Sequence, residues 1–133
     1  EFNASKNEKA ELLQIWVFPK KQGIKPSYEQ KSFSKIEKNA FTALVSGAGK
    51  TGAMHINQDA EFLLGNFEKG KKVSFAPQNA KHGIFVFVIS GKVAVGKEKL
   101  EKRDSAEITG AKEIELKAVE KSKVLVIEVP MVE

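Results

Sequence analysis

The stretch GIFVFVISGKVAVGKEKL, residues 83–100, decides the fold class of this chain. Branched residues recur at every second position from Ile84 to Val88, with aromatic or branched residues between them. Side chains two positions apart point to the same face of a strand, so this pattern predicts a strand with one strongly apolar face. The alternation resumes at Val93 after the pair Gly91–Lys92. A glycine-containing pair between two such runs predicts a β-hairpin.

Short strands are also predicted on both sides of this stretch, each bounded by glycine, proline, asparagine or aspartate. The first, residues 10–18, is apolar almost throughout and is expected to be buried on both faces. Residues 32–41 could form one or two helical turns at most, and we find no longer helical pattern. The chain is therefore predicted to be all-β. The other expected strands are residues 27–33, 40–46, 53–57, 60–67, 71–76, 105–109, 113–120 and 123–129.

The order of the segments after residue 83 reduces the number of possible all-β folds. A buried strand, a glycine turn, a second strand, a turn that carries an acid, a short strand, an alternating strand and a closing buried strand follow one another. This order is typical of a jelly-roll barrel of the cupin type, a double-stranded β-helix. The acidic turn of cupins usually reads Gly-Asp, whereas here it reads Arg103–Asp104. We therefore predict a cupin barrel with a turn of another type at this position.

Composition limits the classes of function. The chain has 133 residues, enough for one domain, with a net charge of +5, no cysteine, and Arg103 as its one arginine. Nucleic-acid recognition relies on arginine forks, and the lysines here are interleaved with glutamates as on a solvated surface, so we expect no nucleic-acid partner. No apolar run reaches the roughly 20 residues of a membrane span, so we expect no membrane partner. The lack of cysteine fits a cytoplasmic location.

The two histidines do not form a recognisable metal motif. A His-x-His pair on a strand would direct two imidazoles at one ion, because residues two apart share a face. Asn57 stands two residues after His55, and Ile84 stands two residues after His82. We therefore expect both histidines at the surface or in turns, and we expect no metal site built from them.

Two further patterns allow more than one interpretation. The segment GAGKTGA, residues 47–53, contains Gly-Lys-Thr, but Leu44 stands where a phosphate-binding loop needs its first glycine. We interpret it as a hairpin turn. The aromatic residues are expected to fill the core, and the alternative is a cavity that binds a flat ligand. These residues are Trp16, Phe18, Tyr28, Phe33, Phe41, Phe62, Phe67, Phe75, Phe85 and Phe87.

Segments near the beginning resemble a known family. Residues 1–3, Glu-Phe-Asn, match the end of a His-Ser-Glu-(Phe/Tyr)-Asn motif. Residues 13–16 match a Leu-Gln-(Ile/Leu)-Trp strand, and residues 26–30 match a loop that ends Pro-(Ser/Arg)-Tyr-(Glu/Gln)-Gln. In these motifs the chain resembles the pirin family, or pirin-like quercetin 2,3-dioxygenases, which are bicupins with two cupin barrels in one chain. The match is dense over the first 33 residues.

The resemblance implies a division of the chain and of its chemistry. Residues 1–9 would be the tail of a preceding cupin barrel, residues 10–33 an inter-barrel strand and connector, and residues 34–133 the C-terminal barrel. Family members bind iron or another divalent metal in the first barrel, and Glu1 aligns with the glutamate of that site. Its histidine partners would lie upstream. An incomplete metal site at Glu1 is therefore expected, with no catalytic residue, no cofactor-binding residue and no bound cofactor in this chain.

The expected function follows from this division. The resemblance implies a metal-free C-terminal cupin domain, the structural and interaction half of a metal-dependent quercetin 2,3-dioxygenase, and we expect the domain alone not to be an enzyme. Its expected partners are its own N-terminal cupin domain and a second copy of the chain, bound through the apolar segment 10–18. Pro19 and Pro26 would hold the connector extended. The alternative is a small-molecule-binding β-barrel without oxygen chemistry.

Overall fold

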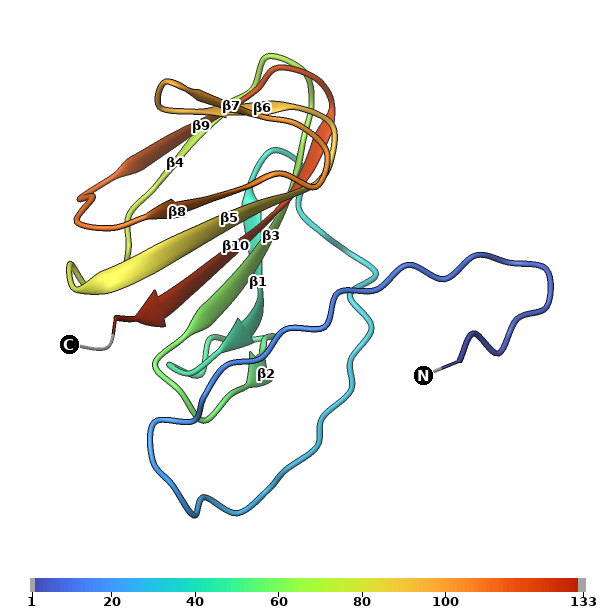
Figure 1. Ribbon diagram of the computed structural model, residues 1–133, viewed down its shortest axis with the longest axis vertical. Helices are drawn as coiled ribbons and strands as arrows, with labels where there is room; N and C mark the ends of the chain where they lie inside the picture. Colours follow the sequence, from blue (N-terminus) through green and yellow to red (C-terminus); the bar gives the residue numbers. More distant parts are fainter. Residues whose placement is uncertain (1, 132–133) are drawn as a thin grey trace.

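The computed structural model describes residues 2–131, which form two packed β-sheets (Figure 1). The larger sheet has the strand order β2-β1-β3-β10-β5-β8, and the smaller sheet has the order β4-β9-β6-β7. This is the all-β jelly-roll architecture that the sequence predicts. The described residues include no helix, and hence none long and apolar enough to cross a membrane. The strands are β1 Phe41–Ser46, β2 Met54–His55, β3 Glu61–Phe67, β4 Lys72–Phe75, β5 His82–Ser90, β6 Val93–Val95, β7 Glu98–Leu100, β8 Ser105–Ile108, β9 Ile114–Ala118 and β10 Ser122–Pro130.

Strand β10 lies in the middle of the larger sheet, antiparallel to β3 on one side and to β5 on the other. Val124 and Val126 point into the space between the sheets and are fully buried. They pack there with the alternating valines of β5 and with Leu116 of the smaller sheet. Burying one such side chain contributes roughly 1.5–3 kcal/mol. The interior is therefore a packed aliphatic core.

Three of the aromatic residues complete this core. Phe41 makes edge-to-face contacts with Phe67 and Phe75, with ring centroids 5.1 and 5.2 Å apart. Such pairs add about 0.5–1.5 kcal/mol to the area they bury. For these three, the prediction that aromatic residues fill the core is confirmed.

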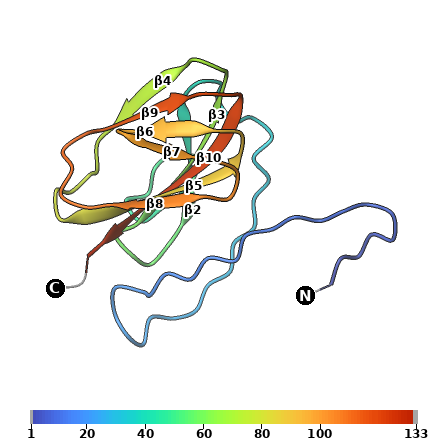
Figure 2. The ribbon, with the colours of Figure 1, turned by 45° about the horizontal axis from the view of Figure 1, so that its top comes forward.

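The pair Gly91–Lys92 is a corner between the sheets, so the predicted hairpin at this position is wrong. Strand β5 pairs with β10 and β8, whereas β6 pairs with β9 and β7 in the other sheet (Figure 2). A short glycine turn between two alternating runs looks the same in both arrangements. The actual hairpin joins β6 to β7, where Val95 faces Glu98 across Gly96 and Lys97.

Ser122 fixes the corner. Its hydroxyl accepts a hydrogen bond from the backbone N–H of Lys92 at 3.0 Å and donates to the carbonyl of Glu120 at 2.7 Å. Gly91 has φ 84° there, and a Cβ atom at this position would lie 2.2 Å from the carbonyl oxygen of Lys121. The ammonium of Lys92 donates to Glu101 at 2.5 Å, and this hydrogen bond raises the pKa of Lys92 above its usual value.

Arg103 occupies the position at which cupin turns usually carry a glycine. Its φ of 72° lies in the left-handed region that favours glycine, so the arginine adopts a glycine-like backbone conformation there. The backbone N–H of Arg103 donates to the carbonyl of Val88 at 2.7 Å. Asp104 closes the turn by accepting a hydrogen bond from the N–H of Glu101 at 2.8 Å.

The segment GAGKTGA also differs from its prediction. Val45 pairs with Met54 in parallel, so β1 and β2 are not the two arms of a hairpin. Gly49 and Gly52 have φ of 74° and 85°, which lets the chain loop back and run in the same direction again. β2 forms one edge of the larger sheet.

Residues 10–33, which we call the strap, run outside the sheets, and the predicted strands 10–18 and 27–33 within it are wrong. The strap is the blue to light-blue path below and beside the sheets in Figure 1. A strand needs a neighbour for its backbone N–H and C=O groups. Within residues 2–131 the strap is attached by isolated hydrogen bonds instead, such as Lys20 N to Asn57 O at 2.9 Å and Gln58 Nε2 to Phe18 O at 2.8 Å.

Replacing Gly91 with alanine is expected to destabilise the fold by about 3 kcal/mol, because it adds left-handed strain and a clash with backbone atoms. The free energy of unfolding measured in urea tests this. Gly96→Ala is the matched control, since Gly96 has φ 59° and open space around a Cβ. It should cost only about 1 kcal/mol. Equal losses for the two variants would contradict the corner geometry.

Replacing Arg103 with glycine is expected to stabilise the chain by up to about 1 kcal/mol, because glycine adopts the left-handed region without a Cβ penalty. The Arg103–Glu11 ion pair that is lost measures 3.5 Å between exposed groups and contributes little. Lys102→Gly, one residue earlier, has no such φ to relieve and should destabilise by about 0.5–1 kcal/mol. A loss of stability in both variants would show that the strain at Arg103 is negligible.

Candidate functional site

A polar cluster lies at one end of the inner face of the larger sheet, around His82 at the start of β5. His82 is 6% exposed, and its Nδ1 donates to Oε1 of Glu128 on β10 at 2.6 Å. The same oxygen accepts a hydrogen bond from the backbone N–H of Gln78 at 2.8 Å. On the other side of the ring, Nε2 lies 3.4 Å from Oδ2 of Asp59, which precedes β3. The imidazole is thus held between two carboxylates.

A second buried carboxylate, Glu61 of β3, is the cross-strand neighbour of Glu128. Glu61 is 2% exposed, and the ammonium of Lys50 lies 2.6 Å from its Oε1. The angles do not make this contact a hydrogen bond, so Oε1 has a counter-charge but no donor among the described residues. Ser46, also buried, accepts a hydrogen bond from the backbone N–H of Lys50 at 3.3 Å. Lys50 therefore neutralises the charge at this position.

The outcome differs among the three residues that the sequence singled out as possible metal ligands. Glu1 lies outside the described residues. His55 is exposed on β2 as expected, with its ring nitrogen 3.3 Å from Asn57 Oδ1. The prediction that His82 lies at the surface or in a turn is wrong, because His82 begins β5 in phase with the inward-facing Ile84.

Sequence reasoning missed Glu61 and Glu128, although a signal was present. Each is the single acidic residue of an otherwise mostly apolar strand, and Glu128 stands two positions after the inward-facing Val126. The same two-residue phase places His82 on the inner face. Strand parity alone would therefore have predicted a buried carboxylate beside a buried histidine.

The residues of the polar cluster do not fit a transition-metal site. Such a site needs three or more ligands that converge on one point. Among residues 2–131 no group of three or more His, Cys, Asp or Glu side chains could hold a metal ion. His82 Nδ1 is already bonded to Glu128, and Glu61 is paired with Lys50. The donor atoms of these side chains are therefore used in contacts within the cluster.

The outer face of the larger sheet is apolar as well. Leu125 and Ile127 of β10 point away from the core cluster, yet both are nearly buried. Phe62 and Phe85 lie opposite Ile127 on the neighbouring strands, and Phe87 lies opposite Leu125. These outward-facing rings are not in the core, so the prediction that all aromatic residues fill the core is wrong for them.

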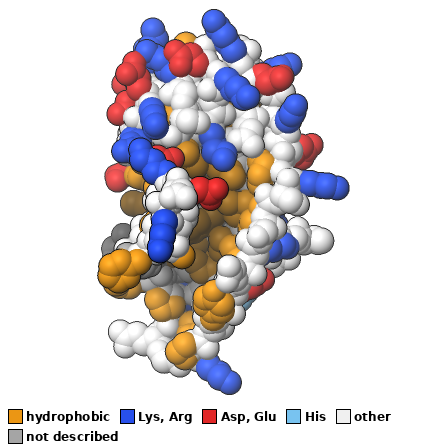
Figure 3. All heavy atoms as spheres, turned by 90° about the vertical axis from the view of Figure 1, so that its right-hand side faces the viewer, with side chains coloured by type: hydrophobic (Ala, Val, Ile, Leu, Met, Phe, Trp, Pro, Cys, Tyr) orange, Lys and Arg blue, Asp and Glu red, His pale blue; other side chains and the backbone are white. Residues whose placement is uncertain are grey.

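The strap adds a second apolar surface beside this face. Figure 3 shows a hollow lined by hydrophobic side chains on the side that carries the strap. Trp16 is 85% exposed, which is the opposite of the buried position expected for it. Several large apolar side chains of the strap are exposed together on this surface. Its exposed large residues are Leu12, Leu13, Ile15, Trp16, Phe18 and Tyr28.

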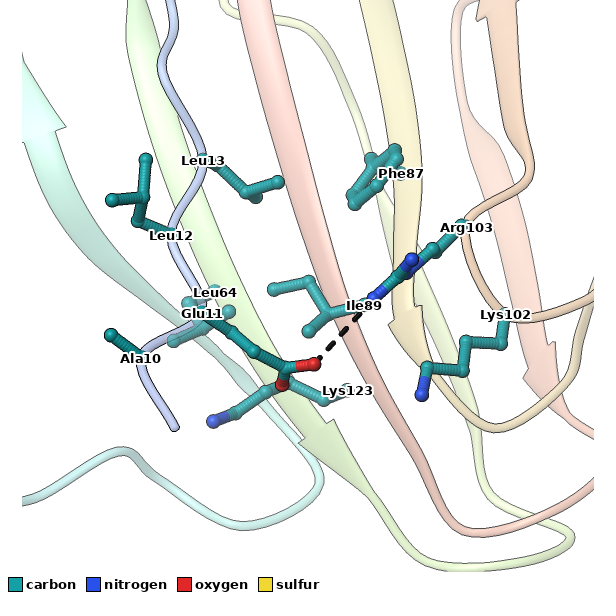
Figure 4. Close-up of a pocket in the computed structure, with 10 residues that line it drawn as sticks. All are labelled: Ala10, Glu11, Leu12, Leu13, Leu64, Phe87, Ile89, Lys102, Arg103 and Lys123. Atoms are coloured by element: carbon teal, nitrogen blue, oxygen red, sulfur yellow. Dashed lines mark hydrogen bonds and ion pairs between the residues drawn. The ribbon is translucent and has the colours of Figure 1, made fainter. Parts of the chain in front are cut away.

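A groove of about 730 Å³ lies between residues 10–13 of the strap and the outer face of the larger sheet (Figure 4). Leu12 and Leu13 form one side, and Phe87 and Ile89 of β5 face them. The cationic side chains gather toward the other end of the groove. They are Lys102, Arg103 and Lys123, accompanied by the carboxylate of Glu11.

Replacing His82 with alanine is expected to destabilise the fold by about 2–3 kcal/mol, because the buried carboxylate of Glu128 loses its side-chain donor. The free energy of unfolding in urea measures this, and His55→Ala is the matched control. It should change stability by no more than about 0.5 kcal/mol, since His55 is exposed. In a double-mutant cycle, His82→Ala and Glu128→Ala should not be additive. Additive losses would contradict the pairing.

Comparisons with known proteins agree with this geometry. The family model described as the quercetinase C-terminal cupin domain matches residues 43–129. A quercetin 2,3-dioxygenase of Escherichia coli K12 is 28% identical over 99% of this chain and 56% of its own length. A pirin-like protein of Caulobacter vibrioides is 29% identical over 91% of this chain and 53% of its own length. The chain thus spans about half the length of these relatives.

A solved structure shows the same fold. YhhW from Escherichia coli superposes with a TM-score of 0.81 over 89% of this chain and 49% of that chain, at 24% sequence identity. The family model covers every strand from inside β1 to the end of β10 apart from its last residue. This chain therefore belongs to the quercetinase C-terminal cupin domain family, the C-terminal cupin of the pirin-like proteins.

Proposed function

We propose that the chain is the metal-free C-terminal cupin half of a two-barrel, pirin-like protein, and that its role there is structural. In this proposal residues 1–9 end the preceding barrel, residues 10–33 connect the barrels, and residues 34–133 form the second barrel. The observation that carries the proposal is the uncovered apolar strap beside the outer face of the larger sheet.

The apolar side chains of the strap would be more stable if another protein surface buried them. The side chains of the strap from Leu12 to Phe18 are exposed except the half-buried Val17, although nearly all of them are apolar. Exposed apolar area costs about 25 cal/mol per Å², so covering it provides a driving force for docking. The relatives are about twice as long as this chain, which supports the preceding cupin barrel as the occupant. Self-association through the same surface is the competing occupant.

The chemistry of the complete protein is then assigned to the preceding barrel. We propose that iron or another divalent metal is held there, with Glu1 as one ligand, and that the complete protein acts as a quercetin 2,3-dioxygenase. The polar cluster around His82 supports this division, because its donors are already used within the cluster. The present chain would contribute a wall and a docking surface. We also propose a cytoplasmic location, which the lack of cysteine supports.

The groove beneath the strap supports a second function, the binding of a small molecule without oxygen chemistry. It differs from the cavity that the sequence suggested, since it lies outside the barrel instead of within it. The interior positions are taken by the aliphatic core. The two functions share Leu12 and Leu13, whereas Trp16 and Phe18 belong to the docking surface and not to the groove.

Trp16 reports on the first proposal, because it is the single tryptophan of the chain. Acrylamide should quench its fluorescence strongly in this chain alone and several-fold less in the complete two-barrel protein, since the preceding barrel would cover the indole. A Trp16→Phe variant of the complete protein identifies the signal that belongs to Trp16. Equal quenching in both proteins would contradict the docking role.

The same two proteins should differ in metal content. After equilibrium dialysis against nickel or iron, the complete protein is expected to retain metal and this chain is not. Analytical ultracentrifugation of this chain at increasing concentration tests the competing occupant. Dimerisation would favour a second copy on the apolar surface, and a monomer at all concentrations would favour the preceding barrel. Tight metal retention by this chain that is lost in His82→Ala, or quercetin cleavage by this chain alone, would refute the proposal.

A further inference from the structure

We propose that the groove beneath the strap binds an amphipathic organic anion, a small molecule with a carboxylate or sulfonate group on an apolar body. The groove is lined entirely by residues of this chain, from the strap, β3, β5, β10 and the turn between β7 and β8. The inference rests on the second proposed function, the binding of a small molecule in this groove, and not on the two-barrel role.

The apolar half of the groove fits the body of such a molecule. Phe87 and Ile89 are adjacent outward-facing positions of β5, and Leu13 of the strap points toward them (Figure 4). Leu64 of β3 lies beneath the strap. A volume of about 730 Å³ falls within the range of small-molecule sites, roughly 300–1,000 Å³. An apolar body placed here would cover part of the exposed surface of Leu12 and Leu13.

The charged half of the groove has more positive than negative side chains. Three cations, Lys102, Arg103 and Lys123, accompany a single acid, Glu11. Among residues 2–131, Lys102 and Lys123 make no ion pair, and Glu11 reaches only Arg103, at 3.5 Å between two exposed side chains. Such an exposed pair is weak, at roughly 0–1 kcal/mol. The groove therefore offers excess positive charge next to apolar surface.

Paired or hydrogen-bonded backbone carries two of these cations, Arg103 and Lys123. Arg103 is part of the turn that its N–H fastens to Val88 and that Asp104 closes. Lys123 belongs to the paired part of β10, opposite Asn66 of β3 and Ser90 of β5. A site whose charged side chains extend from paired strands and a closed turn loses little backbone entropy on binding. An anion is thus favoured over a neutral or cationic molecule of the same shape.

The probe for the test is anilinonaphthalene sulfonate, an aromatic sulfonate whose fluorescence rises in apolar surroundings. We expect saturable binding to the folded chain, weakened by salt, with displacement by dodecanoate. Dodecyltrimethylammonium, which has the same tail and the opposite charge, should not displace the probe at the same concentration below its micelle range. Absence of saturable binding, or equal displacement by the two amphiphiles, would overturn the proposal.

Variants assign the binding to the groove. The double variant Lys102→Gln and Lys123→Gln should weaken probe binding about fivefold or more, since two charge contacts are lost. Arg103→Gly removes the third cation while suiting the left-handed turn, and it should also weaken binding. Lys99→Gln with Lys117→Gln removes two charges from the smaller sheet and should leave binding unchanged. Equal weakening by the control pair, or none by the groove variants, would refute the site.

Discussion

Strand β10 is buried on both faces, and this constraint organises the rest of the molecule. Its inward residues Val124 and Val126 complete the core between the sheets, while Leu125 and Ile127 make the opposite face equally apolar. A strand that is apolar on both faces is stable only where other parts of the protein bury both faces. The smaller sheet provides one cover, and the strap provides only part of the other. Both the docking surface and the groove arise from this incomplete second cover.

The strands of the two sheets could be predicted from the sequence because alternation of apolar residues is a local signal. The expected strands from residue 40 onward all correspond to strands of the structure. The pairing of those strands is not local. The turn at Gly91 was predicted as a hairpin, yet Ser122, about 30 positions later, makes it a corner by binding the backbone of Lys92. The sequence around Gly91 gives no indication of that contact.

The strap illustrates the opposite error. Residues 10–18 have the composition of a buried strand, but a strand forms only where another strand supplies hydrogen bonds. None of the described residues does so. The composition of a segment indicates how favourable its burial would be. Whether the segment is buried and paired depends on the other parts of the molecule. The resemblance also implied a strand at residues 13–16, and the structure shows none there.

The polar cluster and the groove were predictable to different degrees. His82, Glu61 and Glu128 share the inward phase of their strands, so two-residue parity would have brought them together. The groove joins residues 10–13 with Phe87, Arg103 and Lys123, which no spacing in the sequence relates. Such a site depends on where the strap crosses the sheet. That crossing is fixed by contacts far from the groove, such as Phe18 with Gln58.

The edges of the larger sheet have a consequence for how the molecule meets its neighbours. One edge is β2, which spans only Met54–His55, and the other is β8, Ser105–Ile108, which carries the charge of Glu107. Edges this short offer little template for added strands, and a charged residue opposes such addition further. These edges therefore disfavour the strand-to-strand addition by which β-sheet proteins propagate into fibres.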